Sequence, residues 1–308
     1  MDYIKGMTWG WTGVRGTWNT PEAAFSMQEM LRTNVNWTAI AFGALQDHPQ
    51  STNIKYEQSP TVTDAEIVWA IREAHKLELK VCLKPVVNCA NGTWRAHICF
   101  FEAEVPGEPS WGDWFASYEQ FILHYARIAE DNDVEMFCIG CEMVQADRRE
   151  TEWRALISKV REVYSGPITY NCDKYQEERV QWWDAVDIVS SSGYYPIDKW
   201  KERLDALEIL ALRVGKPFFF MEAGCPSRDG SAQLPNDWSH IGDVNLDEQA
   251  DYYRVMFQNT ETRSWFNGFM LWDWPAKLYS SEDATNNDDY CIYLKPAEQV
   301  VADYYSKK

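Results

Sequence analysis

The sequence contains no apolar run of the about 20 residues that a transmembrane helix needs, so a membrane-spanning protein is not expected. Glycine (16) and proline (13) are too sparse among the 308 residues for a collagenous or low-complexity chain. The first residues, MDYIKGMTWGW, lack a basic segment followed by an apolar one, so no signal peptide is visible. These absences leave a globular chain that is long enough for one large domain or two small ones.

Basic residues are in the minority, because 29 Lys and Arg stand against 47 Asp and Glu and give a net charge of −18. A field of this sign repels nucleic-acid phosphates and anionic lipid surfaces, so we expect no nucleic-acid and no membrane partner. The same field disfavours polyanionic substrates. The acidic residues are spread along the chain, which is typical of a solubilising surface.

Metal-ligand patterns are also missing from the sequence. None of the five histidines falls at the end of a predicted strand, and Cys138 and Cys141 lack the second pair that a zinc site requires. We therefore expect no metal and no organic cofactor. The eight cysteines are scattered rather than concentrated as in small disulfide scaffolds, so most are predicted to be buried thiols in a reducing cytoplasm.

Aromatic residues are abundant, with 16 Trp, 16 Tyr and 13 Phe. Many would fill a large core, because each ring buries a large apolar area. Several tryptophans nevertheless lie in polar or glycine-rich stretches instead of apolar runs: Trp9, Trp11, Trp18, Trp94, Trp111 and Trp238. Rings on a concave surface suit a flat, partly apolar partner, and the face of a pyranose sugar is one.

Short apolar segments bounded by Gly, Pro or Asn alternate with segments of helical periodicity. The predicted strands are Ile4–Thr8, Thr38–Phe42, Leu79–Val86, Glu135–Glu142, Ile168–Asn171, Asp187–Ser191, Pro217–Glu222 and Gly268–Trp272. The predicted helices are Pro21–Arg32, Thr63–Leu77, Trp114–Glu130, Glu150–Tyr164, Gln176–Trp183, Lys199–Arg213, Leu246–Asn259 and Pro296–Tyr305. Eight strands in strict alternation with eight helices predict an α/β fold, a single (β/α)₈ TIM barrel.

The loops indicate which end of this barrel is functional. Turns from helix to strand are short, whereas the connections after the third, seventh and eighth strands are long, at about 87–113, 223–245 and 273–295. Catalytic groups of this fold lie on the strand-to-helix side, at the carboxyl ends of the strands. No linker or composition break interrupts residues 1–308, so we expect one catalytic domain.

Two glutamates end predicted strands. Glu142 closes the fourth, EMFCIGCEM, and Glu222 closes the seventh, KPFFFMEAG, so the two face each other across the barrel mouth. A carboxylate at the end of a buried strand needs a partner or a function. One such residue would be an ordinary polar strand end, but a facing pair in a Trp-rich barrel predicts acid/base and nucleophilic catalysis.

Four segments of the chain resemble glycoside hydrolase family 113, a family of retaining clan A enzymes best known for β-1,4-mannanases. They are KGMTWGW, FCIGCEM, PFFFMEAG and FMLWDWP, and the resemblance covers the whole barrel. Cys141 stands where most of the clan has Asn before the acid/base. The resemblance implies a retaining hydrolase of β-1,4-linked mannose-type oligo- or polysaccharides, with Glu142 as acid/base and Glu222 as nucleophile.

Retention fits this division of roles. It needs the two carboxyl groups ~5–5.5 Å apart, and at that distance one of them is driven to stay protonated. Glu142, preceded by Cys141 instead of an amide donor, is expected to have the raised pKa. Glu222 then forms the glycosyl–enzyme intermediate, and water releases the sugar with Glu142 acting as the base.

Aromatic side chains near the strand ends are predicted to support this chemistry. Trp272 would form the floor under the reacting sugar, and Trp274 would face the same side if the strand continues. Trp9 is a candidate wall of the site, and Tyr194 is expected to donate a hydrogen bond that keeps Glu222 ionised.

Three polar residues near strand ends, Lys84, Asn88 and Asn171, are candidates for binding sugar hydroxyl groups. Two of them have an alternative role. Lys84 would instead pair with a strand-end carboxylate, and Asn171 would instead cap the following helix.

Three other functions remain open at this point. The same machinery serves a β-glucosidase or β-glucanase, and it would also serve a hydrolase of N-acetylmannosamine glycans. A catalytically silent carbohydrate-binding barrel would keep the aromatic cleft without turnover. In each case we expect a neutral oligosaccharide as the partner.

Overall fold

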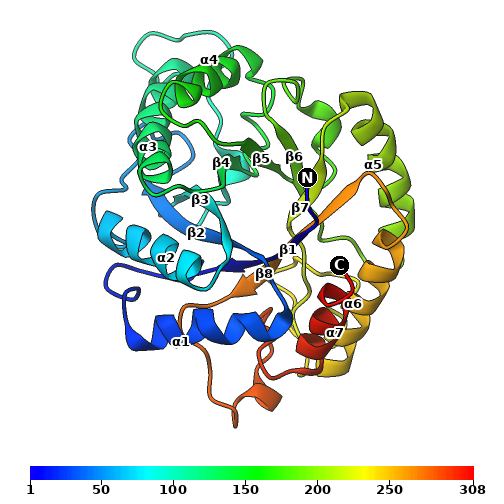
Figure 1. The fold of residues 1–308 in the computed structure, drawn as a ribbon. Coiled ribbons are helices and arrows are strands. Elements are labelled where there is room, and N and C mark those ends of the chain that lie inside the picture. The colour runs from blue at the N-terminus through cyan, green and yellow to red at the C-terminus, as the bar shows by residue number, and fades with distance from the viewer.

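The computed structural model describes residues 1–308 as a closed barrel of eight parallel strands, in which each strand pairs with the next and β8 closes on β1. Figure 1 shows the barrel at the centre with helices around it. The strands are β1 Ile4–Trp9, β2 Trp37–Gln46, β3 Lys80–Cys89, β4 Met136–Cys141, β5 Ile168–Cys172, β6 Ile188–Ser192, β7 Phe218–Glu222 and β8 Phe266–Trp274. The predicted TIM barrel is thus confirmed.

The α-helices are α1 Pro21–Met30, α2 Asp64–Lys76, α3 Trp111–Asp131, α4 Glu150–Arg161, α5 Trp200–Val214, α6 Leu246–Thr260 and α7 Pro296–Tyr305. The capping box that Thr63 and Glu66 predict for α2 is present. Helix α3 begins three residues earlier than predicted, because Ser110 and Asp113 form a second capping box.

The predicted helix Gln176–Trp183 between β5 and β6 is wrong, since this segment holds only the 3₁₀ turn Glu177–Arg179. Tertiary contacts explain the difference. The buried Glu177 carboxylate accepts hydrogen bonds from Ser191 and Tyr195, and the Trp183 indole donates to the Glu177 carbonyl 2.8 Å away. These contacts hold the chain in an irregular path despite its helical periodicity.

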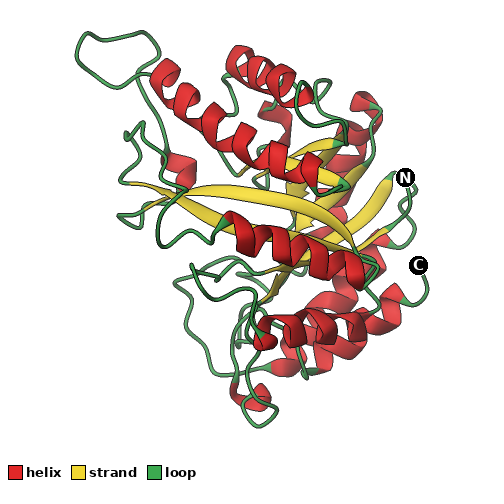
Figure 2. Cartoon of the chain, turned by 60° about the vertical axis from the view of Figure 1, so that its left-hand side comes forward, coloured by secondary structure: helices red, strands yellow, loops and turns green.

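Strands β2 and β3 are longer than predicted and remain paired over ten residues, from Trp37 opposite Lys80 to Gln46 opposite Cys89. They extend beyond the rest of the barrel, as Figure 2 shows. Their long wall carries the β3–α3 loop above the barrel mouth, so residues of this loop can reach over the site from one side.

The barrel interior changes character along its axis. At the amino-terminal end of the strands it is filled by a cluster of ten buried side chains that includes Trp37, Phe219 and Met270. At the carboxyl-terminal end the buried side chains are polar and include Lys84 and Asn171. The larger core, of 78 residues, lies between the barrel and its helices.

Two further features bear on the expectations from sequence. No helix combines the length and the apolar character that a membrane crossing requires. All eight cysteines are free thiols, and all except Cys99 are buried.

Candidate active site

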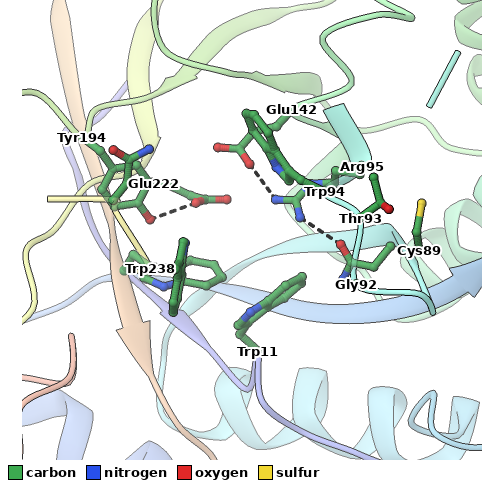
Figure 3. A pocket seen from close by; sticks show the side chains of 13 residues that line it. Trp11, Cys89, Gly92, Thr93, Trp94, Arg95, Glu142, Tyr194, Glu222 and Trp238 are labelled. Atoms are coloured by element: carbon green, nitrogen blue, oxygen red, sulfur yellow. Dashed lines mark hydrogen bonds and ion pairs between the residues drawn. The ribbon is translucent and has the colours of Figure 1, made fainter. Parts of the chain in front are cut away.

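A pocket of about 640 Å³ opens at the carboxyl ends of the strands, and the two predicted catalytic glutamates line it. Their carboxylates come from opposite sides and point into the same cavity (Figure 3). The lining residues are Trp11, Asn88, Cys89, Gly92, Thr93, Trp94, Arg95, Glu142, Tyr194, Glu222, Asn236, Trp238 and Trp272.

Glu222 is the last residue of β7 and is surrounded by groups that favour its ionised form. It forms an ion pair with Lys84 of β3, and the Tyr194 hydroxyl donates to its Oε2 at 2.9 Å. The Cys141 thiol lies 3.4 Å from Oε1. Burial alone would raise the pKa of Glu222, but the charges of Lys84 and Arg95 outweigh it and hold the pKa below its ordinary value.

Glu142 directly follows β4 and has the opposite tendency. Burial and the negative charge of Glu222 raise its pKa above the ordinary value, against the opposing charge of Arg95. Arg95 Nη2 contacts Oε2 at 2.7 Å, and the Ser192 hydroxyl donates to Oε1 at 2.8 Å. Two glutamates with pKa values shifted apart are the arrangement that assigns one as acid and the other as nucleophile. This direction agrees with the raised pKa expected for Glu142.

The prediction that Lys84 and Asn171 bind sugar is wrong, because both side chains are fully buried beneath the pocket. Lys84 pairs with Glu222, which was its alternative role, and also donates to Asn171 Oδ1 at 2.7 Å. Asn171 in turn donates to Ser192 Oγ at 3.0 Å, and Ser192 donates to Glu142. A continuous hydrogen-bonded chain therefore joins the two glutamates under the floor of the pocket.

Trp9 and Trp274 are also misassigned, since both are fully buried in the core beside α1 and their indoles donate to Ser26. Trp9 occupies an outward-facing position of β1, on the same side as Met7. The register of β8 against β1 shifts beyond Met7, so Trp274 does not share the inward direction of Trp272.

Three of the predicted supporting residues do line the pocket. Trp272 lies beneath it with Lys84 Nζ 5.6 Å from its ring centroid, and Tyr194 makes the predicted hydrogen bond to Glu222. Asn88 is also among the lining residues, and its Oδ1 accepts a hydrogen bond from Arg95 at 2.9 Å.

Sequence reasoning missed the contribution of the loops. Trp11, Trp94 and Trp238 carried a signal, since they lie in polar stretches, but no strand end identified them. Arg95 carried no signal. The β3–α3 loop brings it back over β4, where it donates to the Cys141 carbonyl at 3.0 Å and pairs with Glu142.

The chain is similar to known glycoside hydrolases over its full length. The sequence model of Glycoside Hydrolase Family 113 matches residues 7–295. A solved structure described as a complex of a family 113 β-1,4-mannanase is 53% identical, with 100% of each chain covered and a TM-score of 0.99. The family 113 β-mannanase of Alicyclobacillus acidocaldarius, solved in complex with ManMIm, is 49% identical over 100% of this chain and 98% of its own, with a TM-score of 0.97. No curated protein sequence matches the chain.

More distant structures share the fold alone. The β-glucuronidase of Ruminococcus gnavus is 14% identical and has a TM-score of 0.67, and the match covers 100% of this chain and 50% of that one.

Proposed function

The chain belongs to glycoside hydrolase family 113, and on this premise we propose that it hydrolyses β-1,4-linked mannose-type oligo- or polysaccharides with retention of configuration. The observation that carries the proposal is the pair of buried glutamates at facing strand ends, whose pKa values are shifted in opposite directions. Full-length relatives described as β-1,4-mannanases support the mannose-type substrate over gluco-configured and N-acetylated ones.

In the first step, the ionised Glu222 attacks the anomeric carbon while protonated Glu142 gives its proton to the departing glycosidic oxygen. Lys84 and Tyr194 hold Glu222 in the ionised form, Lys84 through the ion pair to Oε1 and Tyr194 through the hydrogen bond to Oε2. The bond to the leaving group breaks as the ester to Glu222 forms, and Glu142 becomes a carboxylate. Arg95, already 2.7 Å from Glu142, stabilises that carboxylate.

In the second step, Glu142 acts as a base toward water. Once Glu222 is esterified, its negative charge no longer raises the pKa of Glu142, so the ionised form of Glu142 becomes the favoured one. Glu142 takes a proton from water, the oxygen attacks the anomeric carbon, and the ester to Glu222 breaks. Both glutamates then return to their starting protonation states.

Proton NMR of the enzyme with β-1,4-manno-oligosaccharides, and with cello-oligosaccharides as comparison, tests the proposal. We expect the β-anomer to appear first, and from the mannose series only. Early α-anomer would mean inversion and would contradict the role of Glu222 as nucleophile. In the same experiment Glu222→Gln should lose at least about 10³-fold in turnover. Binding without turnover in the unaltered protein would instead favour the silent carbohydrate-binding barrel.

We also propose that residues 1–308 act as one catalytic domain in the cytoplasm. The eight free thiols support a reducing compartment. Cell fractionation with an activity assay tests the location, and activity in the culture medium would contradict it.

A further inference from the structure

The backbone that carries Glu142 departs from regular strand geometry. Four residues of β4, Cys138 to Cys141, face only three of β5, Thr169 to Asn171, so β4 contains a bulge just before the glutamate. Glu142 itself has φ +51°, in the left-handed region that non-glycine residues seldom adopt. Such a conformation persists only where the surrounding structure holds it.

A closed ring of hydrogen bonds holds the chain directly after Glu142. The Met143 amide donates to the Tyr170 hydroxyl at 3.0 Å, and that hydroxyl donates to Asp147 Oδ1. The Asp147 amide then donates back to the Met143 carbonyl at 3.0 Å. Without Tyr170, the Met143 amide would be a buried donor with no partner, because the ladder with β5 ends at Glu142.

The side chains that form this ring of hydrogen bonds are buried and packed on several sides. The Tyr170 ring is fully buried and packs against both Trp153 and Trp182, at centroid distances of 5.2 and 4.9 Å. Trp182 also donates from its indole to the Asp147 carbonyl at 3.0 Å. Gly140 lies against the aromatic ring of Tyr170, since a Cβ at this position would come within 3.0 Å of that ring. The support is therefore anchored in the packed layer between the barrel and α4.

Asp147 is the unusual member of the ring. Its side chain is buried, Tyr170 is the one hydrogen-bond partner of its carboxylate, and Oδ2 has none. An unpaired carboxylate oxygen in the core is costly and calls for a compensating role. Burial raises the pKa of Asp147 to about 7, against the opposing hydrogen bond from Tyr170 and the charge of Arg179.

We propose that Tyr170 and Asp147 are positioning residues that fix the peptide of Glu142, so that its carboxyl group meets the leaving oxygen in the first step. The proposal rests on the proposed function, since it assumes that Glu142 is the acid/base. Neither residue lines the pocket, so both act through the backbone instead of through contact with sugar.

A leaving-group series tests this role with Tyr170→Phe. A misplaced general acid harms substrates whose leaving group needs a proton, and it spares those whose leaving group departs as a stable anion. We expect kcat/KM for mannotriose to fall about tenfold and that for 2,4-dinitrophenyl β-mannobioside to fall less than about twofold. Equal losses on both substrates would overturn the positioning role.

Two further variants and a matched control complete the series. Asp147→Asn keeps an acceptor for the Tyr170 hydroxyl, whereas Asp147→Ala removes it, so the leaving-group-dependent loss should be larger for Asp147→Ala.

The control is Tyr164→Phe, which removes a buried hydroxyl bonded to the Val134 carbonyl, at the amino-terminal end of the strands. We expect it to lower the melting temperature without dependence on the leaving group. Leaving-group dependence in the control, or the same loss in both Asp147 variants, would overturn the proposal.

Hydrogen exchange of residues 139–147 supplies a measurement that needs no turnover. In Tyr170→Phe we expect the protection of this segment to fall while that of the other strands stays unchanged. Unchanged protection would overturn the ring of hydrogen bonds, whatever the activity. If the unaltered protein cleaves neither substrate, the proposed function fails, and the exchange result still decides whether Tyr170 holds this segment.

Discussion

Lys84 contacts Glu222 from the buried side of the barrel, where neither group has meaningful access to water. Together with the charge of Arg95, the contact lowers the pKa of the proposed nucleophile, although burial alone would raise it. At the residue scale, the proposed division of roles between two identical side chains thus depends on how closely each one is paired with a cation. Glu222 has Lys84 beneath it, whereas Glu142 has Arg95 above it and remains under the influence of Glu222.

Replacing Lys84 by Met should raise the pKa of Glu222. Attack requires ionised Glu222, so activity should then disappear at a higher pH on the acidic side. We expect the acidic limb of kcat/KM to move up by about one pH unit or more, and kcat to fall about 10²-fold. The alkaline limb, which reports loss of the proton from Glu142, should move less. The measurement is a pH profile with manno-oligosaccharides.

Lys80→Met is the matched control, because Lys80 begins the same strand but is exposed and far from the pocket. It should leave both limbs where they are. An acidic limb that stays in place in Lys84→Met would show that Lys84 does not govern the ionisation of Glu222.

The site residues that could be predicted are those fixed by strand ends. Glu222 follows from an apolar run that stops and Tyr194 from its position just beyond the sixth strand, and the barrel brings such strand ends to one mouth. Trp9 and Trp274 could not be placed in the same way. Alternation within a strand gives relative direction only, and the shift of β8 against β1 changes which of its tryptophans faces inward.

At the scale of elements, the two long loops after β7 and β8 are joined through one buried ammonium group. Lys295 Nζ donates to Ser227 Oγ at 2.8 Å, to Asn287 Oδ1 at 2.6 Å and to the Asp289 carbonyl at 3.1 Å. The joined loops carry Tyr290, whose ring packs 5.2 Å from Trp238 at the rim of the pocket. Lys295 therefore supports the wall of the pocket although it touches no part of it.

Lys295→Met should loosen these loops, since it leaves several buried oxygen acceptors without a donor. We expect a loss of about 1–3 kcal/mol in the free energy of unfolding. The KM for mannotriose should rise several-fold while kcat changes less, because the catalytic glutamates keep their partners. Thermal unfolding and steady-state kinetics measure the two effects. Lys201→Met, on the exposed surface of α5, is the control, and equal KM values in the two variants would contradict the role.

Periodicity and capping predicted most of the helices, but this prediction failed where tertiary contacts replace helical hydrogen bonds. The segment between β5 and β6 has a helical pattern, but buried Glu177 and Trp183 hold it in an irregular path. Arg95 is a similar case. Its position over Glu142 depends on how a long loop folds back across β4, and no local pattern encodes that.

At the scale of the whole molecule, the interior of the barrel is apolar at the amino-terminal ends of the strands and polar at their carboxyl-terminal ends. Several acidic side chains near the carboxyl-terminal ends are therefore buried away from water. Burial raises the pKa of Asp147 to about 7, and burial together with the charge of Glu142 also raises the pKa of Asp173. Both groups bind protons more strongly in the folded chain than in the unfolded one. The fold is thereby coupled to pH by groups outside the catalytic pair.

The direction of this coupling can be tested. Between about pH 4 and pH 8 the folded chain holds more protons than the unfolded chain at these two sites, so stability should fall as pH rises through that window. We expect a melting temperature about 5 °C higher at pH 5.5 than at pH 8.5. Asp147→Asn removes one of the two groups and should reduce the difference, whereas Asp205→Asn, on the exposed surface of α5, should not. A melting temperature that rises with pH over this range would show that carboxyl groups with lowered pKa values, such as Glu222, dominate the balance instead.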